Sequence, residues 1–189
     1  MGQYYKFIIL ADTKKNNKEV ILLYINPHDY NHGAKLMEHS YMNTDLMNIV
    51  EYLISVHGNF YKSRIVWAGD YAEEELTDTD TDNDTGESMN LYRLTENYSS
   101  YTGMVSESFG KYIVNHTKKL YVDKDKDKNK ENSIHPLPLL ISEGNGNGGG
   151  DYHGNNEDLC GTWARDIISM ENTIPENYTE LDCNFGEYY

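Results

Sequence analysis

Hydrophobic residues near the N-terminus gather in two short runs that a polar segment separates. Residues 4–11 (YYKFIILA) and residues 20–26 (VILLYIN) are apolar or aromatic over most of their length. Runs this short, bounded by polar residues, favour strands over helices. Residues 12–19 (DTKKNNKE) between them have the composition of a turn, so we expect the two strands to pair in antiparallel fashion.

Apolar residues beyond position 43 follow a helical spacing instead. The residues that share one helical face are Leu46, Ile49, Val50, Leu53 and Ile54. Asn43 or Thr44 can cap the start of such a helix, and Gly58 can end it. We therefore predict one principal amphipathic helix in this part of the chain.

Shorter apolar runs predict further strands. Residues 64–68 predict one apolar strand, and residues 111–115 and 120–123 predict a second hairpin. Residues 137–142 (LPLLIS) are interpreted as a strand that lies at the edge of the sheet or is only partly paired. Pro138 has no backbone N–H to donate to a neighbouring strand, so it disfavours a central position.

The C-terminal part of the chain is expected to hold a short helix at residues 162–170 and a surface-wrapping tail from Glu171 onward. The order of elements indicates an α+β fold with a mainly antiparallel sheet, one principal amphipathic helix and long polar loops. We interpret residues 1–189 as a single domain, with low-complexity loops inserted at residues 73–90 and 123–133.

The charge of the chain argues against nucleic acid as a partner. The sequence has 31 acidic and 16 basic side chains and a formal charge of −15, which repels a polyanion. Nine of the acidic residues lie between positions 70 and 87, so the rest of the chain carries only −6. The exclusion therefore rests chiefly on the scarcity of arginine, since only Arg64, Arg93 and Arg165 are present.

The cysteine content and the apolar runs indicate a soluble protein of a reducing compartment. Cys160 and Cys183 are too few for a disulfide framework in a chain of 189 residues. The N-terminus has no pattern of a signal peptide, and no apolar run approaches the ~20 residues that span a bilayer. We expect a cytoplasmic protein without membrane association.

Two patterns suggest metal binding, but the first lacks required residues and the second lacks the required geometry. The alternating acids that begin at Asp78 would need Gly at position 83 and Glu at position 89 for a calcium loop, but the chain has Asn83 and Met89. His28 and His32 lie in a stretch broken by proline and glycine, where no helix directs both rings at one ion. We predict no metal site, no cofactor and a solvated acidic loop.

Five glycines lie within residues 144–150. Gly144, Gly146 and Gly149 have the G-x-G-x-x-G spacing, but polar residues follow in place of the apolar helix that a dinucleotide fold requires. Two interpretations stay open: the backbone closely approaches a ligand or another strand, or the segment is a flexible loop.

Four polar residues beside the predicted elements are candidates for acid–base catalysis. Asp70 and Glu143 each follow an apolar run, where a strand can hold them rigidly. Asp151 closes the glycine-rich segment, and His39 precedes the helix. The residues expected to contact a ligand are Glu38, Trp67, Gly146, Gly149, Tyr152 and Arg165.

His39 has a second interpretation, which its neighbours favour. Glu38, His39 and Ser40 can simply cap and pack the entry of the helix. The spacing of the candidates does not show that they meet in space. Neither a G-x-S-x-G elbow nor a Cys–His signature supports acyl transfer.

Six sequence blocks, spread over most of the chain, are distinctive. They are MGQYY at residues 1–5, GAKLMEHS at 33–40, VWAGDYA at 66–72, VNHTKK at 114–119, HPLPL at 135–139 and GTWA at 161–164. These blocks resemble a family of proteins from bacteriophages and large DNA viruses that has no established activity. The resemblance implies a viral origin and transfers no catalytic residue.

Three functions are carried forward from these patterns. The leading hypothesis is a viral accessory protein that binds a host protein or a small metabolite in the cytoplasm of the infected cell. The rival is a small hydrolase or transferase for a nucleotide-like substrate, in which the four acid–base candidates act and Arg165 holds an anion. The third is a structural component of the virion.

Overall fold

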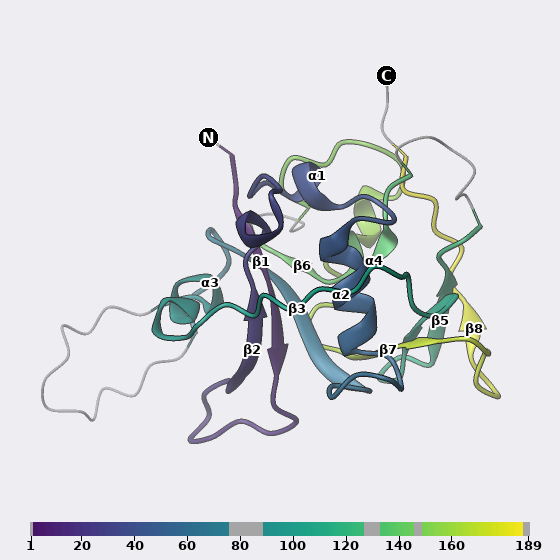
Figure 1. Ribbon diagram of the computed structural model, residues 1–189, viewed down its shortest axis with the longest axis horizontal. Coiled ribbons are helices and arrows are strands. Elements are labelled where there is room, and N and C mark those ends of the chain that lie inside the picture. Colours follow the sequence, from purple (N-terminus) through teal and green to yellow (C-terminus); the bar gives the residue numbers. More distant parts are fainter. Residues whose placement is uncertain (1, 76–88, 127–132, 146–148, 187–189) are drawn as a thin grey trace, which may run out of the picture.

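The structure is a computed structural model that describes residues 2–75, 89–126, 133–145 and 149–186. In this part of the chain, eight strands form one sheet (Figure 1), in the order β2-β1-β3-β7-β4-β5-β8, with β6 beside β3. Their bounds are Tyr5–Leu10 (β1), Ile21–Ile25 (β2), Ser63–Gly69 (β3), Tyr112–Asn115 (β4), Leu120–Asp123 (β5), Ser142–Glu143 (β6), Ile167–Glu171 (β7) and Thr179–Glu180 (β8).

Most neighbouring strands are antiparallel, which confirms the predicted mixed α and β structure with a mainly antiparallel sheet. Only the pairs β3–β6 and β5–β8 are parallel among the described strands. The two predicted hairpins are confirmed, with Ile8 opposite Tyr24 in the first and Ile113 opposite Val122 in the second.

Helices are short and lie on both faces of the sheet. Their bounds are Leu36–His39 (α1), Asp45–Leu53 (α2), Leu91–Leu94 (α3) and Pro136–Leu140 (α4), with 3₁₀ turns at Pro27–Tyr30 (η1), Thr95–Asn97 (η2) and Glu157–Leu159 (η3). Helix α2 begins where the sequence predicts, because the Thr44 hydroxyl accepts a hydrogen bond from the Met47 amide at 3.2 Å. It ends at Leu53, before the predicted stop at Gly58.

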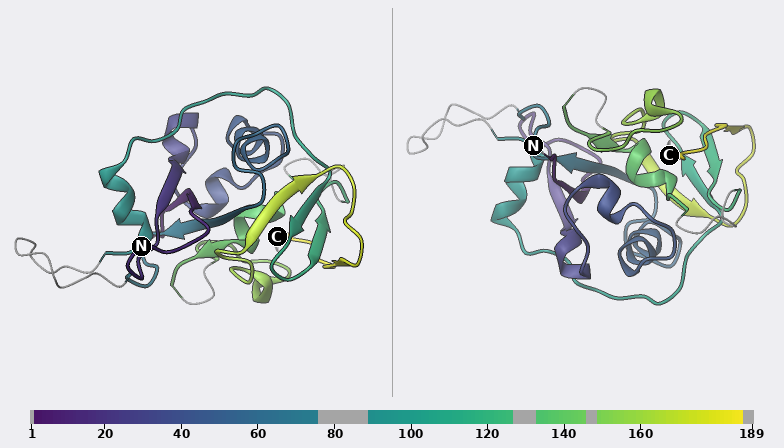
Figure 2. Two further views of the ribbon diagram at one scale, coloured as in Figure 1. Left: turned by 90° about the horizontal axis from the view of Figure 1, so that it is seen from below. Right: turned by 90° about the horizontal axis from the view of Figure 1, so that it is seen from above.

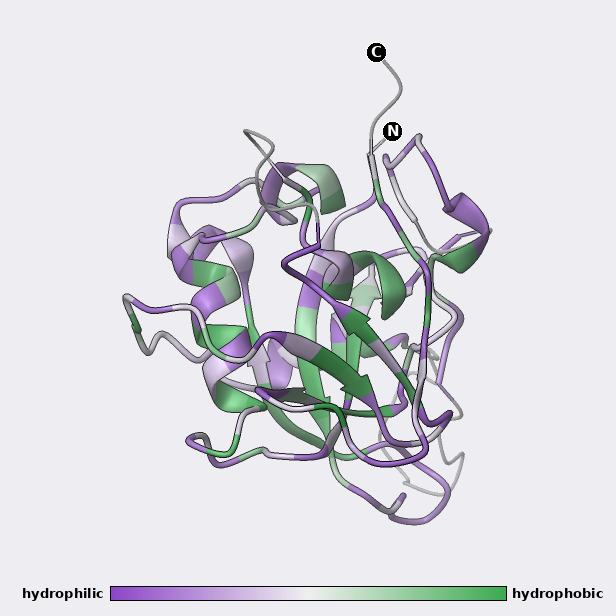
Figure 3. Ribbon diagram, turned by 90° about the vertical axis from the view of Figure 1, so that its right-hand side faces the viewer, coloured by the Kyte–Doolittle hydropathy of each residue, from purple (hydrophilic) through white to green (hydrophobic). Residues whose placement is uncertain are grey.

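Strand β1 is buried along its whole length because both of its faces are covered. Phe7 and Ile9 pack in the main core with α2, whereas Ile8 and Leu10 pack in a second, smaller cluster with Leu91 of α3. Figure 2 accordingly shows β1 and β2 between α2, seen nearly end-on, and α3. The hydropathy colouring in Figure 3 shows hydrophobic residues concentrated on the central strands and polar residues on the loops.

Two predicted elements are wrong. Residues 137–142 are mostly the helix α4, which begins at Pro136 after His135 as its cap. Proline fits the first turn of a helix, where its missing N–H is not needed, so the two prolines start a helix rather than interrupt a strand. Residues 162–170 are not a helix, because Arg165 adopts a left-handed backbone conformation (φ 65°) and the chain continues as β7.

The C-terminal segment is only partly a surface tail. Strand β8 is exposed and pairs with β5, but Cys183 and Phe185 are buried against the main core. Of the predicted low-complexity loops, residues 76–88 and 127–132 lie outside the described residues. A hydrogen bond of 3.0 Å from the Glu75 amide to the Met89 carbonyl closes the base of the first loop.

Candidate functional site

His39 lies in the centre of the core. Its side chain is fully buried, Nδ1 lies 2.9 Å from the Gly33 carbonyl oxygen, and Nε2 lies 2.8 Å from the indole nitrogen of Trp67. Because an indole N–H can only donate and a carbonyl can only accept, Nε2 carries no proton and Nδ1–H donates. Burial lowers the pKa of His39 to about 4. Both ring nitrogens are used inside the core, which is the arrangement expected of a packing residue.

Acidification is expected to destabilise the fold well above the pH at which carboxylates protonate. His39 has a pKa near 6.5 in the unfolded chain and about 4 in the fold, so the unfolded state binds more protons between these values. Its contribution is complete above pH 6.5 and declines toward pH 4, by up to about 3 kcal/mol. Burial also lowers the pKa of His135, which acts in the same direction.

Urea unfolding at pH 7, 5.5 and 4 measures this effect as a fall in the midpoint. The variant His39→Gln removes the titrating group, so its midpoint should vary less over the same range. A wild-type midpoint that is constant from pH 7 to pH 4 would contradict the assigned state of His39.

Asp70 and Asp151 each accept a backbone hydrogen bond, and the charges of both act on Tyr5. The Asp151 carboxylate accepts a hydrogen bond from the Met37 amide at 3.0 Å, and Asp70 accepts one from the Tyr4 amide at 3.0 Å. Burial, followed by the charges of Asp151 and Asp70, raises the pKa of Tyr5 well above its usual value. Both carboxylates therefore influence Tyr5, and each is held in place by a backbone amide.

The described part of the glycine-rich segment packs against the core. A side chain at Gly150, whose φ is 62°, would come within 2.8 Å of the Tyr5 hydroxyl, and one at Gly149 would lie 3.1 Å from the sulfur of Cys160. These contacts match the interpretation in which the backbone approaches another strand closely. Tyr152 is buried and donates a 2.6 Å hydrogen bond to the Asn155 carbonyl, and Gly146 lies outside the described residues.

Two other predicted ligand contacts stabilise local structure. Glu38 accepts a hydrogen bond from the Lys35 amide at 3.0 Å and so caps the start of α1. Trp67 is fully buried in β3, where its ring packs on His39 and Phe7.

Glu143 and Arg165, by contrast, come together at a partly exposed position. The guanidinium of Arg165 donates hydrogen bonds of 2.8 Å and 2.6 Å to the two carboxylate oxygens of Glu143. It also contacts Glu75 through both carboxylate oxygens and Glu19 at 3.3 Å. Glu19 in turn accepts two hydrogen bonds of 2.9 Å from Arg64. We call these five residues the arginine–carboxylate cluster.

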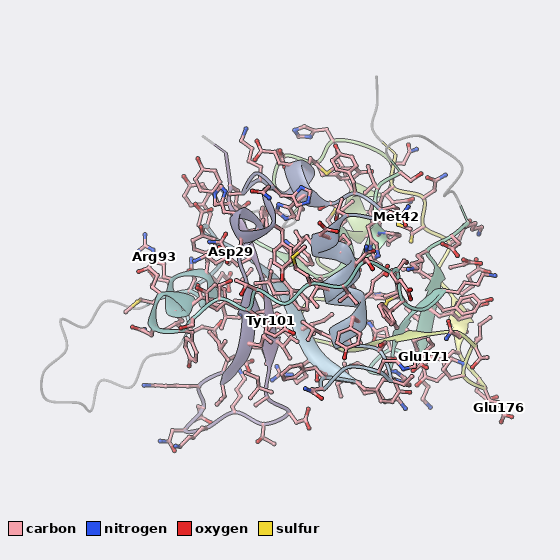
Figure 4. All side chains as sticks on the ribbon, in the orientation of Figure 1. Asp29, Met42, Arg93, Tyr101, Glu171 and Glu176 are labelled. Carbon is pink, nitrogen blue, oxygen red and sulfur yellow. The ribbon has the colours of Figure 1, made fainter. Side chains whose placement is uncertain are left out.

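All members of the arginine–carboxylate cluster with a shifted pKa are held in their charged forms. Burial would raise the pKa of Glu19, but the hydrogen bonds and charge of Arg64 lower it overall. Burial would lower the pKa of Arg165, but Glu143 and Glu75 raise it overall. Two of the three arginines of the chain are therefore committed here, while Arg93 is an exposed residue of α3 (Figure 4).

A cavity of about 520 Å³ adjoins this cluster, between the start of β2 and the α3–η2 segment. The residues that line it are Lys18, Glu19, Ile21, Glu75, Leu94, Asn97 and Tyr98. Ile21 and Leu94 supply an apolar surface continuous with the second core cluster, and Tyr98 is 47% exposed. The volume lies within the ~300–1,000 Å³ typical of small-molecule sites.

Sequence reasoning identified Arg165 and Glu143 but missed the residues around them. Glu19 and Arg165 are 146 positions apart, and Arg64 and Glu19 are 45 apart, so spacing along the chain gives no signal. The only local sign was the position of Arg64 at the start of an apolar strand, where a charge needs a partner.

A second polar network surrounds the buried side chains of Glu51, Lys124 and His135. The Glu51 carboxylate contacts the Lys124 ammonium, accepts a 2.9 Å hydrogen bond from His135 and accepts hydrogen bonds of 2.8 Å and 2.7 Å from Ser108 and Phe109. Burial would raise the pKa of Glu51, but the hydrogen bond from His135 and the charge of Lys124 lower it to about 2. Glu51 and Lys124 are nearly inaccessible, so this network suits stability and not ligand binding.

A third network contains a serine beside a histidine. Ser169 Oγ lies 2.7 Å from His116 Nε2, and Tyr178 lies 2.9 Å from His116 Nδ1. Ser169 is fully buried and also donates a 2.7 Å hydrogen bond to Glu171. A nucleophile must reach its substrate, so this pair does not provide the accessible hydroxyl of a hydrolase.

Comparisons with protein-family models, curated proteins and solved structures give no match to this chain. Among the described residues, no group of three or more His, Cys, Asp or Glu side chains is arranged to hold a metal ion. No helix within the described ranges is long and apolar enough to cross a membrane. The cavity beside the arginine–carboxylate cluster is therefore the candidate functional site on its geometry alone.

Proposed function

We propose that the protein is a viral accessory protein that binds a small molecule in the cavity between β2 and the α3–η2 segment. The observation that carries the proposal is this cavity of about 520 Å³, with an apolar surface of Ile21 and Leu94 beside a cluster of charged residues. Small-molecule sites combine such apolar walls with a few polar groups that fix orientation. The sequence resemblance supports a viral origin in this proposal, and the low cysteine content supports a cytoplasmic location.

The rest of the fold serves to hold this site. In the proposal, α2 is the principal amphipathic helix of an α+β domain, and it packs on the face of β1 opposite to the cavity. The second core cluster under α3 then keeps the cavity walls in place.

The rival proposal of a hydrolase or transferase has less support. His39 is neutral and enclosed, and Asp151 and Asp70 each accept a backbone hydrogen bond. Glu143 is paired with Arg165. A general base needs reach to the proton that it removes, and none of these side chains lines the described cavity. No contact of the described residues favours a virion component over a binding protein.

A thermal-shift screen of aromatic and aliphatic fragments tests the proposal with Leu94→Trp as the blocked variant. The indole should fill the cavity, so fragments that raise the Tm of the wild type should no longer do so in Leu94→Trp. A ligand at 100 times its Kd stabilises the fold by about 2.7 kcal/mol, which such a screen detects. Leu22→Trp, at an exposed β2 position outside the cavity, is the matched control and should respond like the wild type.

Two results would contradict this function. One is a set of fragments that stabilises the wild type and Leu94→Trp equally, which would place binding elsewhere. The other is a screen in which no fragment stabilises any of the three proteins.

A further inference from the structure

Glu75 belongs both to the cavity wall and to the arginine–carboxylate cluster. Its two carboxylate oxygens face the guanidinium of Arg165, and Oε2 lies 3.2 Å from Nη1 of Arg165. Arginine binds carboxylate and phosphate ligands through the same two-pronged contact. Glu75 therefore occupies the position on Arg165 that an anionic group in the cavity would take.

Among the three carboxylates on Arg165, Glu75 lines the cavity and lies outside the strands. Glu19 is 1% exposed and also binds Arg64 and Lys14, and Glu143 is fixed in β6 beside β3. Glu75 belongs to no helix or strand, and among the described residues its side chain forms hydrogen bonds with Arg165. Its release would leave Arg165 still paired with Glu143 and Glu19.

The charges around the cavity favour an anion once Glu75 is displaced. Four basic residues lie in or beside the cavity and its cluster, namely Lys14, Lys18, Arg64 and Arg165. Glu19, Glu75 and Glu143 oppose them, so release of Glu75 leaves two carboxylates against four cations. Within this set of residues the cations then outnumber the carboxylates, although the chain as a whole has a formal charge of −15.

We propose that the ligand of this cavity is a small amphipathic anion. Its carboxylate or phosphate group replaces Glu75 on Arg165, and its apolar or aromatic body lies against Ile21 and Leu94. This inference rests on the proposed function, because it assigns a chemical class to the ligand of the same cavity.

Four probes with one aromatic body test the assignment: phenyl phosphate, phenylacetate, neutral phenylacetamide and cationic phenethylamine. Calorimetric titration measures their Kd for the full chain and for Glu75→Gln. The glutamine removes the competing charge, so we expect the two anionic probes to bind Glu75→Gln about fivefold to tenfold more tightly than the wild type. The Kd of phenylacetamide should stay within about twofold. The ratio between phenyl phosphate and phenylacetate distinguishes a phosphate ligand from a carboxylate ligand.

Glu73→Gln is the matched control, because Glu73 is exposed and lies two positions from Glu75. It removes the same unit of charge and should leave all four affinities unchanged, whereas equal gains in both variants would overturn the specific role of Glu75. If phenylacetamide binds but the anions gain nothing from Glu75→Gln, the ligand class is wrong and the binding function stands. Tightest binding of phenethylamine would also overturn the anion assignment. If no probe binds either protein, both proposals fail.

Discussion

Replacement of Glu51 by glutamine is expected to lower the free energy of unfolding by about 3–5 kcal/mol. The substitution leaves the Lys124 ammonium in the core without the carboxylate that compensates it, and the Lys124 side chain is only 1% exposed. An isolated buried charge is costly, because the interior solvates it poorly. Glutamine keeps the size of the side chain, so the loss reports on charge and hydrogen bonding rather than on a cavity.

Urea unfolding of the wild type and of Glu51→Gln measures this loss. Glu180→Gln is the matched control, since Glu180 also pairs with a lysine, Lys126, but both side chains are at least 41% exposed. An exposed ion pair contributes about 0–1 kcal/mol, so the control should be nearly neutral. Lys124→Met in the Glu51→Gln background should recover part of the stability, because it removes the unpaired charge. Equal effects of Glu51→Gln and Glu180→Gln would show that the Glu51 network is not the buried pair described.

Replacement of His39 by alanine is expected to cost about 3–5 kcal/mol of unfolding free energy. The substitution opens a cavity in the core and leaves the indole N–H of Trp67 and the Gly33 carbonyl without their partners. Each unsatisfied buried group adds a cost of about 1–3 kcal/mol.

A double-mutant cycle separates the hydrogen bond from the packing. Trp67→Phe removes the indole donor, so it should be less costly in the His39→Ala background than in the wild type. The coupling free energy, obtained from four urea unfolding curves, is expected to be about 1 kcal/mol or more. If the changes in unfolding free energy of the two substitutions are strictly additive, the hydrogen bond between the indole of Trp67 and the imidazole of His39 is contradicted.

The local sequence pattern was sufficient to predict those strands and helices for which apolar spacing and flanking residues indicate the same structure. The short apolar run around Phe7, Ile8 and Ile9 predicted a strand, and α2 followed from its apolar spacing and from a cap at Asn43 or Thr44. The local sequence pattern failed where one residue type is compatible with two different local structures. Pro138 disfavours a central strand but suits the first turn of α4, and nothing in the sequence reveals the left-handed conformation of Arg165 that ends the expected helix.

The candidate site was only partly predictable, for a physical reason. Glu143 stood out because it follows an apolar run, and Arg165 because it could hold an anion, but the sequence did not predict that the two residues pair. Their other partners come from β3, the segment before β2 and the start of the acidic segment, and only the sheet order brings these together. His39 shows the opposite case, since a histidine beside a helix has the same sequence signature in a core as in a catalytic site.

Methyl NMR of the full chain with phenyl phosphate and phenylacetamide tests the binding function most directly. The account predicts that the methyl signals of Ile21 and Leu94 shift in a saturable way, because both side chains line the cavity. The methyl signals of Ile49 and Leu137, in the main core, should stay unchanged. Shifts confined to Ile49 and Leu137, or no saturable shift at Ile21 and Leu94 with either probe, would contradict a small-molecule site between β2 and α3.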